Sequence, residues 1–204
     1  LIWVRLSASP YFSKSGEFLG YHGSATDITQ NVQLEQLAYT DSLTGIANRV
    51  AFFHRVEKEM QRAKRLSYEM GVMMLDLDYF KKVNDKYGHD AGDKIIMAIA
   101  NLGNEAMRSR DVLARLGGEE FAAVLPDSSL EEAKAIAERL REKVESHQLD
   151  YEGTTLNVTI SVGAANIRQV SAEFDSMLNA ADEAMYEAKA LGRNKVFCYK
   201  TSEE

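Results

Sequence analysis

Residues 112–125 read VLARLGGEEFAAVL, in which two glycines and two glutamates stand between two apolar runs. The apolar runs are typical of β-strands, and Gly117 and Gly118 suit a tight turn because glycine reaches positive φ at little cost. The stretch therefore predicts a β-hairpin. The hairpin leaves Glu119 and Glu120 unexplained, since two like charges about 4 Å apart repel by roughly 4 kcal/mol at an effective dielectric constant near 20. Either this is an ordinary solvated turn, or something positive binds beside it.

Helical and strand patterns alternate on both sides of the hairpin, from about residue 40 onward. Apolar residues at helical spacing predict helices at about 48–66, 91–107, 129–144 and 174–191. The third of these begins with the capping box Ser129 to Glu132. Strand patterns occur at 71–78, 156–162 and 196–199. This order predicts an α/β fold, an α+β sandwich in which helices flank a mixed sheet.

The first part of the chain has a different pattern. Residues 1–29 alternate as strands around a turn at 13–18, and residues 30–39 have helical spacing. Two strands alone do not bury a core. We therefore expect 1–29 to be the end of a domain that begins upstream in a longer protein, with 30–39 as a connecting helix and 40–204 as the main domain.

Composition excludes several classes of function. The 204 residues carry a net charge of −7, whereas a surface that binds duplex nucleic acid usually has a basic excess, so no nucleic-acid polymer is expected as a partner. The single cysteine excludes an internal disulfide framework and a cysteine-cluster metal site, and it fits a reducing compartment. No apolar run approaches the roughly 18 residues that span a bilayer. We expect a cytoplasmic location without membrane contact in this chain, although a longer protein could be anchored upstream.

The strand at 71–78 ends in Asp76-Leu77-Asp78. An unpaired carboxylate where a buried strand emerges is costly, so Asp76 requires a cation nearby. If this strand lies beside the hairpin, Asp76 meets Glu119 or Glu120, and oxygen ligands of this kind favour Mg²⁺. The alternative is that Asp76 or Asp78 only caps the next turn.

Two further pairs of polar residues have two interpretations each. Asn84 and Asp93 together could read a guanine edge, because an amide can serve O6 or N7 while a carboxylate accepts from N1 and N2. They could equally be turn formers. Lys189 and Arg193 could hold phosphate, or they could simply suit the dipole at a helix C-terminus.

Six separated stretches resemble, in order, the motifs of GGDEF domains, the diguanylate cyclases. They are DSLTGIANR (41–49), DLDYFKKVND (76–85), YGHDAGD (87–93), RLGGEEF (115–121), SVGAA (161–165) and ADEAMYEAKALGRNK (181–195). The resemblance covers roughly residues 40–200. Glu119 stands in place of the aspartate that names the motif, which makes this the GGEEF variant. Leu116, often aromatic in the family, and Ile46, often leucine, are mild departures.

The resemblance implies a palm-like sheet related to nucleotidyl cyclases, and condensation of two GTP molecules into cyclic di-GMP with release of two pyrophosphates. It implies a Mg²⁺ or Mn²⁺ cofactor at the catalytic residues, held by Asp76, the Leu77 carbonyl and Glu119, with Glu120 also at the metal. The implied substrate contacts are guanine to Asn84 and Asp93, phosphates to Lys81, Lys189 and Arg193, and the ribose and α-phosphate against the backbone of Gly118.

The resemblance also implies regulation in bacterial second-messenger signalling. Catalysis would need a homodimer, and cyclic di-GMP would inhibit by binding Arg108 and Asp111, an Arg-x-x-Asp pair just upstream of the hairpin. The alternative for this pair is an ordinary charged helix end. Residues 20–29 resemble the end of a PAS sensor domain, so an upstream sensor would control the enzyme.

Three other functions remain as alternatives. One is a binding module of the same family that has lost catalysis and only senses GTP or cyclic di-GMP. The second is a cyclase or polymerase for another nucleotide, which Asn84 and Asp93 argue against because adenine lacks the N1 and N2 donors. The third is a structural interaction domain, which would not need six polar motifs.

Overall fold

The structure is a computed structural model that describes residues 1–170 and 174–200, apart from the side chains of 35–37 and 174. The chain divides into two compact units, Leu1–Tyr39 and Thr40–Glu204. No helix of the described ranges is long and apolar enough to cross a membrane.

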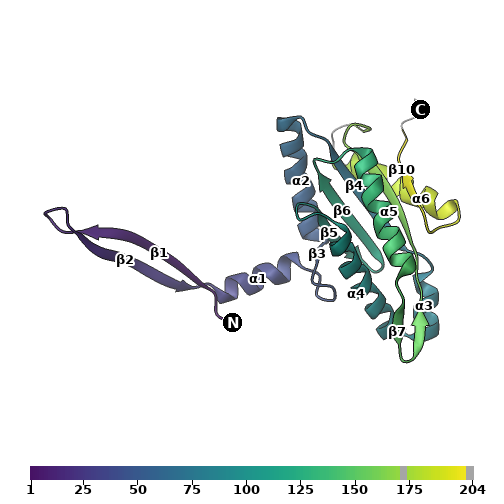
Figure 1. The fold of residues 1–204 in the computed structure, drawn as a ribbon, viewed down its shortest axis with the longest axis horizontal. Helices are drawn as coiled ribbons and strands as arrows, with labels where there is room; N and C mark the ends of the chain where they lie inside the picture. The colour runs from purple at the N-terminus through teal and green to yellow at the C-terminus, as the bar shows by residue number, and fades with distance from the viewer. Residues whose placement is uncertain (171–173, 201–204) are drawn as a thin grey trace. The chain divides into compact units, whose positions relative to one another are not determined.

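The first unit is a hairpin followed by a helix. Strand β1 (Val4–Phe12) pairs antiparallel with β2 (Phe18–Asp27), and helix α1 (Thr29–Tyr39) follows (Figure 1). None of the side chains described in this unit is buried, including the large apolar ones of Trp3, Leu6, Tyr11, Phe12, Phe18 and Tyr21. The unit thus has no core of its own among its described residues.

The second unit is built on a mixed sheet with the strand order β10-β9-β4-β6-β5-β3. The central strand β4 runs antiparallel to both of its neighbours, whereas β10 pairs parallel with β9 and β3 pairs parallel with β5. The sheet strands are β3 (Ala47–Asn48), β4 (Met70–Leu77), β5 (Val112–Gly117), β6 (Glu120–Pro126), β9 (Ile160–Asn166) and β10 (Val196–Cys198). The helices are α2 (Arg49–Leu66), α3 (Phe80–Tyr87), α4 (His89–Ala106), α5 (Leu130–Ser146) and α6 (Phe174–Ala190). This arrangement confirms the predicted α/β fold with helices flanking a mixed sheet (Figure 1).

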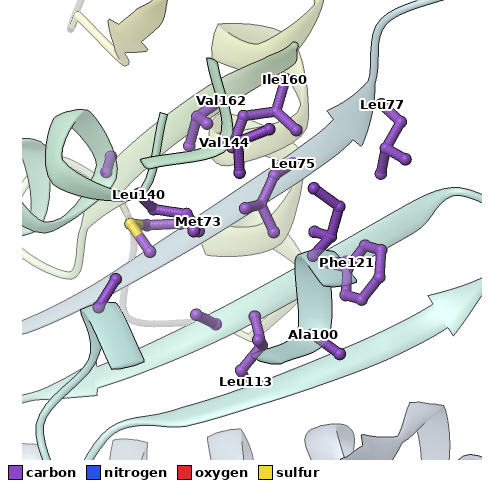
Figure 2. Packing of buried hydrophobic residues seen from close by; sticks show 14 of the residues in the cluster. Met73, Leu75, Leu77, Ala100, Leu113, Phe121, Leu140, Val144, Ile160 and Val162 are labelled. Atoms are coloured by element: carbon purple, nitrogen blue, oxygen red, sulfur yellow. The ribbon is translucent and has the colours of Figure 1, made fainter. Parts of the chain in front are cut away.

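Strand β4 is buried along its whole length because helices cover both faces of the sheet. Met73, Leu75 and Leu77 project into the core that β4 forms with α4 and α5 (Figure 2). The alternate residues Met70, Val72 and Met74 pack in a second core with α2 and α6. Because side chains alternate along a strand, the next residue on the α2 and α6 face is Asp76. The fold thereby sets a carboxylate where this apolar face ends.

Two local elements differ from the sequence prediction, and a third feature agrees with it. Helix α3 was not predicted, although Phe80, Val83 and Tyr87 have helical spacing; the helix ends before Gly88, where the pattern is interrupted. The strand predicted at 156–162 is broken, because Leu156 closes the small hairpin β7 (Leu149–Tyr151) and β8 (Thr154–Leu156), and β9 begins only at Ile160. The predicted capping box of α5 is confirmed: Ser129 and Glu132 hydrogen-bond each other's backbone N–H groups.

Candidate functional site

Three carboxylates gather where β4 meets the hairpin of β5 and β6. Asp76 lies directly opposite Glu120 in the antiparallel register, and Glu119 occupies the turn beside them. Burial raises the pKa of Asp76 above its ordinary value. Lys189 lowers this pKa in part, and the charges of Glu119 and Glu120 raise it again. The raised pKa thus reflects chiefly the burial of this carboxylate, to which its acidic neighbours add.

The glycines of the hairpin leave space above the turn. Gly118 has a φ of 49°, in the left-handed region that favours glycine, and a Cβ atom added there would meet no atom within 4 Å. The space beside the Gly118 backbone is therefore open in the described structure.

Arg115 stabilises this turn, a role that was not predicted from the sequence. Arg115 donates from Nε to the carbonyl oxygen of Gly118 at 3.0 Å, and from Nη1 to Asp41 Oδ1 at 3.2 Å. Asp41 also accepts hydrogen bonds from the backbone N–H and the hydroxyl of Thr44. Burial alone would raise the pKa of Asp41, but the hydrogen bonds from Thr44 and Arg115 outweigh it and hold this pKa below its ordinary value. The first and fourth of the motif stretches are thus joined by an ion pair.

Lys189 lies in the last turn of α6 and forms an ion pair with Asp76, at 3.0 Å between Nζ and Oδ1. Its side chain is 28% exposed. Lys189 therefore does more than complement the helix dipole, because it brings a cation to the carboxylates.

The donor set suits a hard cation with an incomplete protein shell. Within the described residues, no group of three His, Cys, Asp or Glu side chains is arranged to hold a metal by itself. Mg²⁺ usually takes one or two carboxylates and completes its shell with waters and phosphate oxygens, and Mn²⁺ accepts the same ligands. Asp76 with Glu119 or Glu120 satisfies that requirement.

The carbonyl of Leu77 is also oriented toward this group. The N–H of Asp78 donates to the Thr159 carbonyl on the β9 side, and C=O and N–H of one trans peptide point in opposite directions. The Leu77 carbonyl therefore points to the β6 side, where the register between β4 and β6 ends at Asp76 and Glu120. An oxygen ligand at this position fits the same cation.

Asn84 on α3 packs against Gly92 of α4, the residue before Asp93. A Cβ atom added to Gly92 would lie 2.0 Å from Asn84 Oδ1, so the glycine makes the room in which this amide sits. Asn84 Oδ1 is buried and has no hydrogen-bond partner among the described residues, and Asp93, the residue after Gly92, is exposed. A buried polar atom without a partner is rare, and it points to a ligand that supplies one.

The remaining predicted phosphate contacts lie around α3. Lys81 is exposed in the first turn of this helix. The guanidinium of Arg193 lies over the ring of Tyr79, with its Cζ 4.7 Å from the ring centroid. The role of Tyr79 was not predicted from the sequence, which gave no indication of this contact.

Arg108 and Asp111 lie together in the segment between α4 and β5, outside any helix. The backbone N–H of Arg108 donates to Asp111 Oδ2 at 2.8 Å, and Asp111 Oδ1 is buried without a partner in the structure. The guanidinium of Arg108 forms an ion pair with Glu132 at 3.0 Å. The pair thus lies just after the end of α4, with Arg108 bonded to both Asp111 and Glu132.

The alternative that Asp76 or Asp78 caps the next helix is wrong. The N-cap position of α3 is Tyr79, and no side chain donates or accepts a capping hydrogen bond there. Asp76 pairs with Lys189. The Asp78 carboxylate accepts hydrogen bonds from Ser161 on β9 and from Asn194 after α6. Both aspartates thus act through tertiary contacts.

Residues 38–195 match the family described as "Diguanylate cyclase, GGDEF domain". A probable diguanylate cyclase of Escherichia coli, DgcT, is 41% identical over 181 residues, which are 88% of this chain and 38% of that protein. The chain thus spans well under half of the length of this relative.

Solved structures agree with this match. The coiled coil and GGDEF domain of DgcB from Caulobacter crescentus, in complex with c-di-GMP, has a TM-score of 0.77 and 30% identity, covering 83% of this chain and 90% of that one. The active GGEEF domain of a diguanylate cyclase from Vibrio cholerae has a TM-score of 0.70 and 29% identity, covering 77% of this chain and 99% of that one.

Proposed function

Because the chain belongs to the GGDEF domain family of diguanylate cyclases, we propose that it condenses two GTP molecules into cyclic di-GMP and two pyrophosphates. The observation that carries this proposal is the register that sets Asp76 opposite Glu120, with Glu119 in the adjoining turn. Such a cluster of carboxylates suits the metal-assisted chemistry of phosphoryl transfer.

In the proposed reaction, each 3′-hydroxyl attacks the α-phosphate of the other GTP, and pyrophosphate leaves. Asp76, Glu119, Glu120 and the Leu77 carbonyl hold Mg²⁺ or Mn²⁺. When bound, this cation lowers the pKa of the 3′-hydroxyl and offsets negative charge on the α-phosphate. Glu119 lies in the turn and is our candidate to accept the hydroxyl proton.

The other predicted residues bind and orient GTP in this proposal. Asn84 and Asp93 hydrogen-bond to the guanine edge, where the unpartnered Asn84 Oδ1 gains a donor. Lys81, Arg193 and Lys189 would bind phosphates, and for this Lys189 would exchange its ion pair with Asp76 for a phosphate oxygen. The open backbone of Gly118 receives the ribose and α-phosphate. Together these contacts favour GTP over ATP.

The direct test is incubation of the chain with GTP and Mg²⁺, followed by chromatography of the products. Cyclic di-GMP and pyrophosphate support the proposal. GTP that is bound but not converted, at concentrations that allow dimers, identifies a binding module instead. Linear products from GTP identify a polymerase, and conversion of ATP in a parallel incubation identifies an enzyme for another nucleotide.

We propose that the active species is a homodimer, since one site holds one GTP and each nucleotide attacks the other. Specific activity is therefore expected to rise with protein concentration in the micromolar range, as assembly of two sites becomes complete. Turnover per chain is measured across a hundredfold dilution, with light scattering on the same samples. A flat activity profile from a confirmed monomer contradicts the dimer.

We also propose that cyclic di-GMP inhibits the enzyme at Arg108 and Asp111. An arginine fork matches phosphate or the Hoogsteen edge of guanine, and the unpartnered Asp111 Oδ1 can accept from guanine N1 or N2. Glu132 competes for Arg108, because its carboxylate already pairs with the guanidinium.

Two variants test the inhibitory site in opposite directions. Arg108→Ala is expected to relieve inhibition and spare the initial rate. Glu132→Gln keeps an oxygen for the capping box but removes the competing charge, so it should tighten cyclic di-GMP binding by up to about fivefold. Isothermal titration with cyclic di-GMP measures both. Equal affinity in wild type and Arg108→Ala would falsify the assignment of Arg108.

For the first unit we propose that residues 1–29 are the C-terminal part of a PAS-like sensor domain, 30–39 a connecting helix and 40–204 the cyclase domain. Support comes from the antiparallel hairpin with exposed aromatic residues on both strands, which suits a surface that packs on further structure. We further propose that this sensor controls the cyclase, and that the protein acts in the cytoplasm.

A further inference from the structure

Asp78 is a buried carboxylate that the proposed reaction does not use. It is 4% exposed. Oδ1 accepts a hydrogen bond from the Ser161 hydroxyl at 2.7 Å, and Oδ2 accepts from the Thr159 hydroxyl at 2.7 Å and from the backbone N–H of Asn194 at 2.9 Å. Burying a carboxylate is costly unless hydrogen-bond donors surround it. The three hydrogen bonds therefore hold the Asp78 carboxylate in one position.

The hydrogen bond from Asn194 connects Asp78 to the turn after α6. In that turn Arg193 and Asn194 have φ angles of 65° and 47°, which residues other than glycine rarely adopt. The side chain of Asn194 is held as well, because its Oδ1 accepts from Arg141 at 3.0 Å and its Nδ2 donates to Glu145 at 2.7 Å. An uncommon backbone conformation of this kind persists only when its surroundings enforce it.

The sequence neighbours of Asp78 and Asn194 also contact each other. Tyr79 follows Asp78, Arg193 precedes Asn194, and the Arg193 guanidinium lies 4.7 Å from the centroid of the Tyr79 ring. Lys82 lies over the same ring at 4.3 Å. Tyr79 has a φ of 58°, and its side chain is largely exposed. The hydrogen bond fixes the backbone beside Arg193, and the aromatic ring fixes the guanidinium.

We propose that Asp78 and Tyr79 are positioning residues that hold Arg193 ready to bind the triphosphate of GTP. The inference rests on the proposed function, in which Arg193 contacts phosphate. Arginine loses side-chain freedom when it binds, and a guanidinium that is already oriented loses less. Loosening either contact therefore weakens GTP binding, and it raises KM more than it lowers kcat.

The test compares variants with and without Arg193. Asp78→Asn weakens a charged hydrogen bond beside Arg193 and is expected to raise KM for GTP roughly tenfold. Tyr79→Leu removes the cation–π contact and is expected to raise KM about two- to fivefold. Tyr79→Phe keeps the ring and should restore the wild-type KM. In the Arg193→Ala background, neither Asp78→Asn nor Tyr79→Leu should raise KM further, because the group they position is gone. The affinity for a non-hydrolysable GTP analogue, from isothermal titration, gives a second readout independent of turnover.

The outcomes separate this inference from the function on which it rests. If Asp78→Asn is too unstable to purify, the largely exposed Tyr79 still provides a cycle in a folded protein. Equal effects of Tyr79→Leu with and without Arg193, or an unchanged affinity for the analogue, overturn the positioning role and leave the cyclase proposal intact. If the wild type does not bind GTP or the analogue, both are overturned together.

Discussion

Glu120→Gln and Asp76→Asn are each expected to lower the conversion of GTP to cyclic di-GMP by about a hundredfold or more, and to leave the fold intact. Each change removes one negative charge from the metal site with almost no change in shape. Glu120 is exposed, and Asp76 is buried where the apolar face of β4 ends, with Lys189 as a partner to which an asparagine oxygen can still bond. Glu120→Gln also relieves repulsion from Asp76 and Glu119, so its thermal unfolding temperature should not fall.

The measurement is product formation by chromatography, with circular dichroism and thermal unfolding on the same preparations. Glu183→Gln is the matched control, because Glu183 is exposed on α6 and lies outside the carboxylate cluster. It should keep wild-type turnover. Undiminished turnover in both Glu120→Gln and Asp76→Asn would show that these two carboxylates are not the metal ligands, whatever the control shows.

The second large effect is expected at the guanine contacts. Asn84→Ala combined with Asp93→Ala should weaken GTP binding by about a hundredfold, because a site built to pair the polar edge of a base loses both partners. ITP, which lacks the 2-amino group of guanine, separates recognition of the base from recognition of the phosphates. Wild type should prefer GTP to ITP, and the double variant should bind both with similar low affinity.

Gly92→Ala is expected to disturb the guanine contact of Asn84 indirectly, by displacing its side chain. The added methyl group would meet Asn84 Oδ1 at 2.0 Å and Phe80 at 2.9 Å, so the amide has to move. This variant should lose GTP affinity without losing a polar group. Asp90→Ala, on the exposed first turn of α4, is the control that should bind like wild type. If titration shows unchanged GTP affinity in the double variant, guanine is recognised elsewhere.

The sequence allowed the sheet and the meeting of the carboxylates to be predicted because both depend on local patterns. The apolar run before Asp76 indicated a buried strand, and two glycines between apolar runs indicated the hairpin that carries Glu119 and Glu120. The assumption that these two elements are neighbours was the one long-range step, and the register confirms it.

Contacts between distant residues could not be predicted in this way. Asp78 looked like a turn cap, yet its partners are 81 to 116 residues away in the sequence. The same holds for Arg115 and Asp41, which are 74 residues apart. Helix α3 was missed for a different reason: its apolar spacing is present, but its polar composition and the glycine after Tyr87 favoured an irregular segment.

The position of β4 between β6 and β9 has a consequence for how the protein folds. Residue 76 pairs with residue 120 on one side and with residue 161 on the other, so both neighbours of the strand are distant in the chain. Pairing of this kind requires the closure of long loops and is associated with slow folding. In the nascent chain Glu119 and Glu120 are adjacent, but Asp76 is distant from both in the sequence. The repulsion between Asp76 and these two glutamates arises only when the central strand is enclosed, at a stage when the apolar cores on both faces already compensate for it.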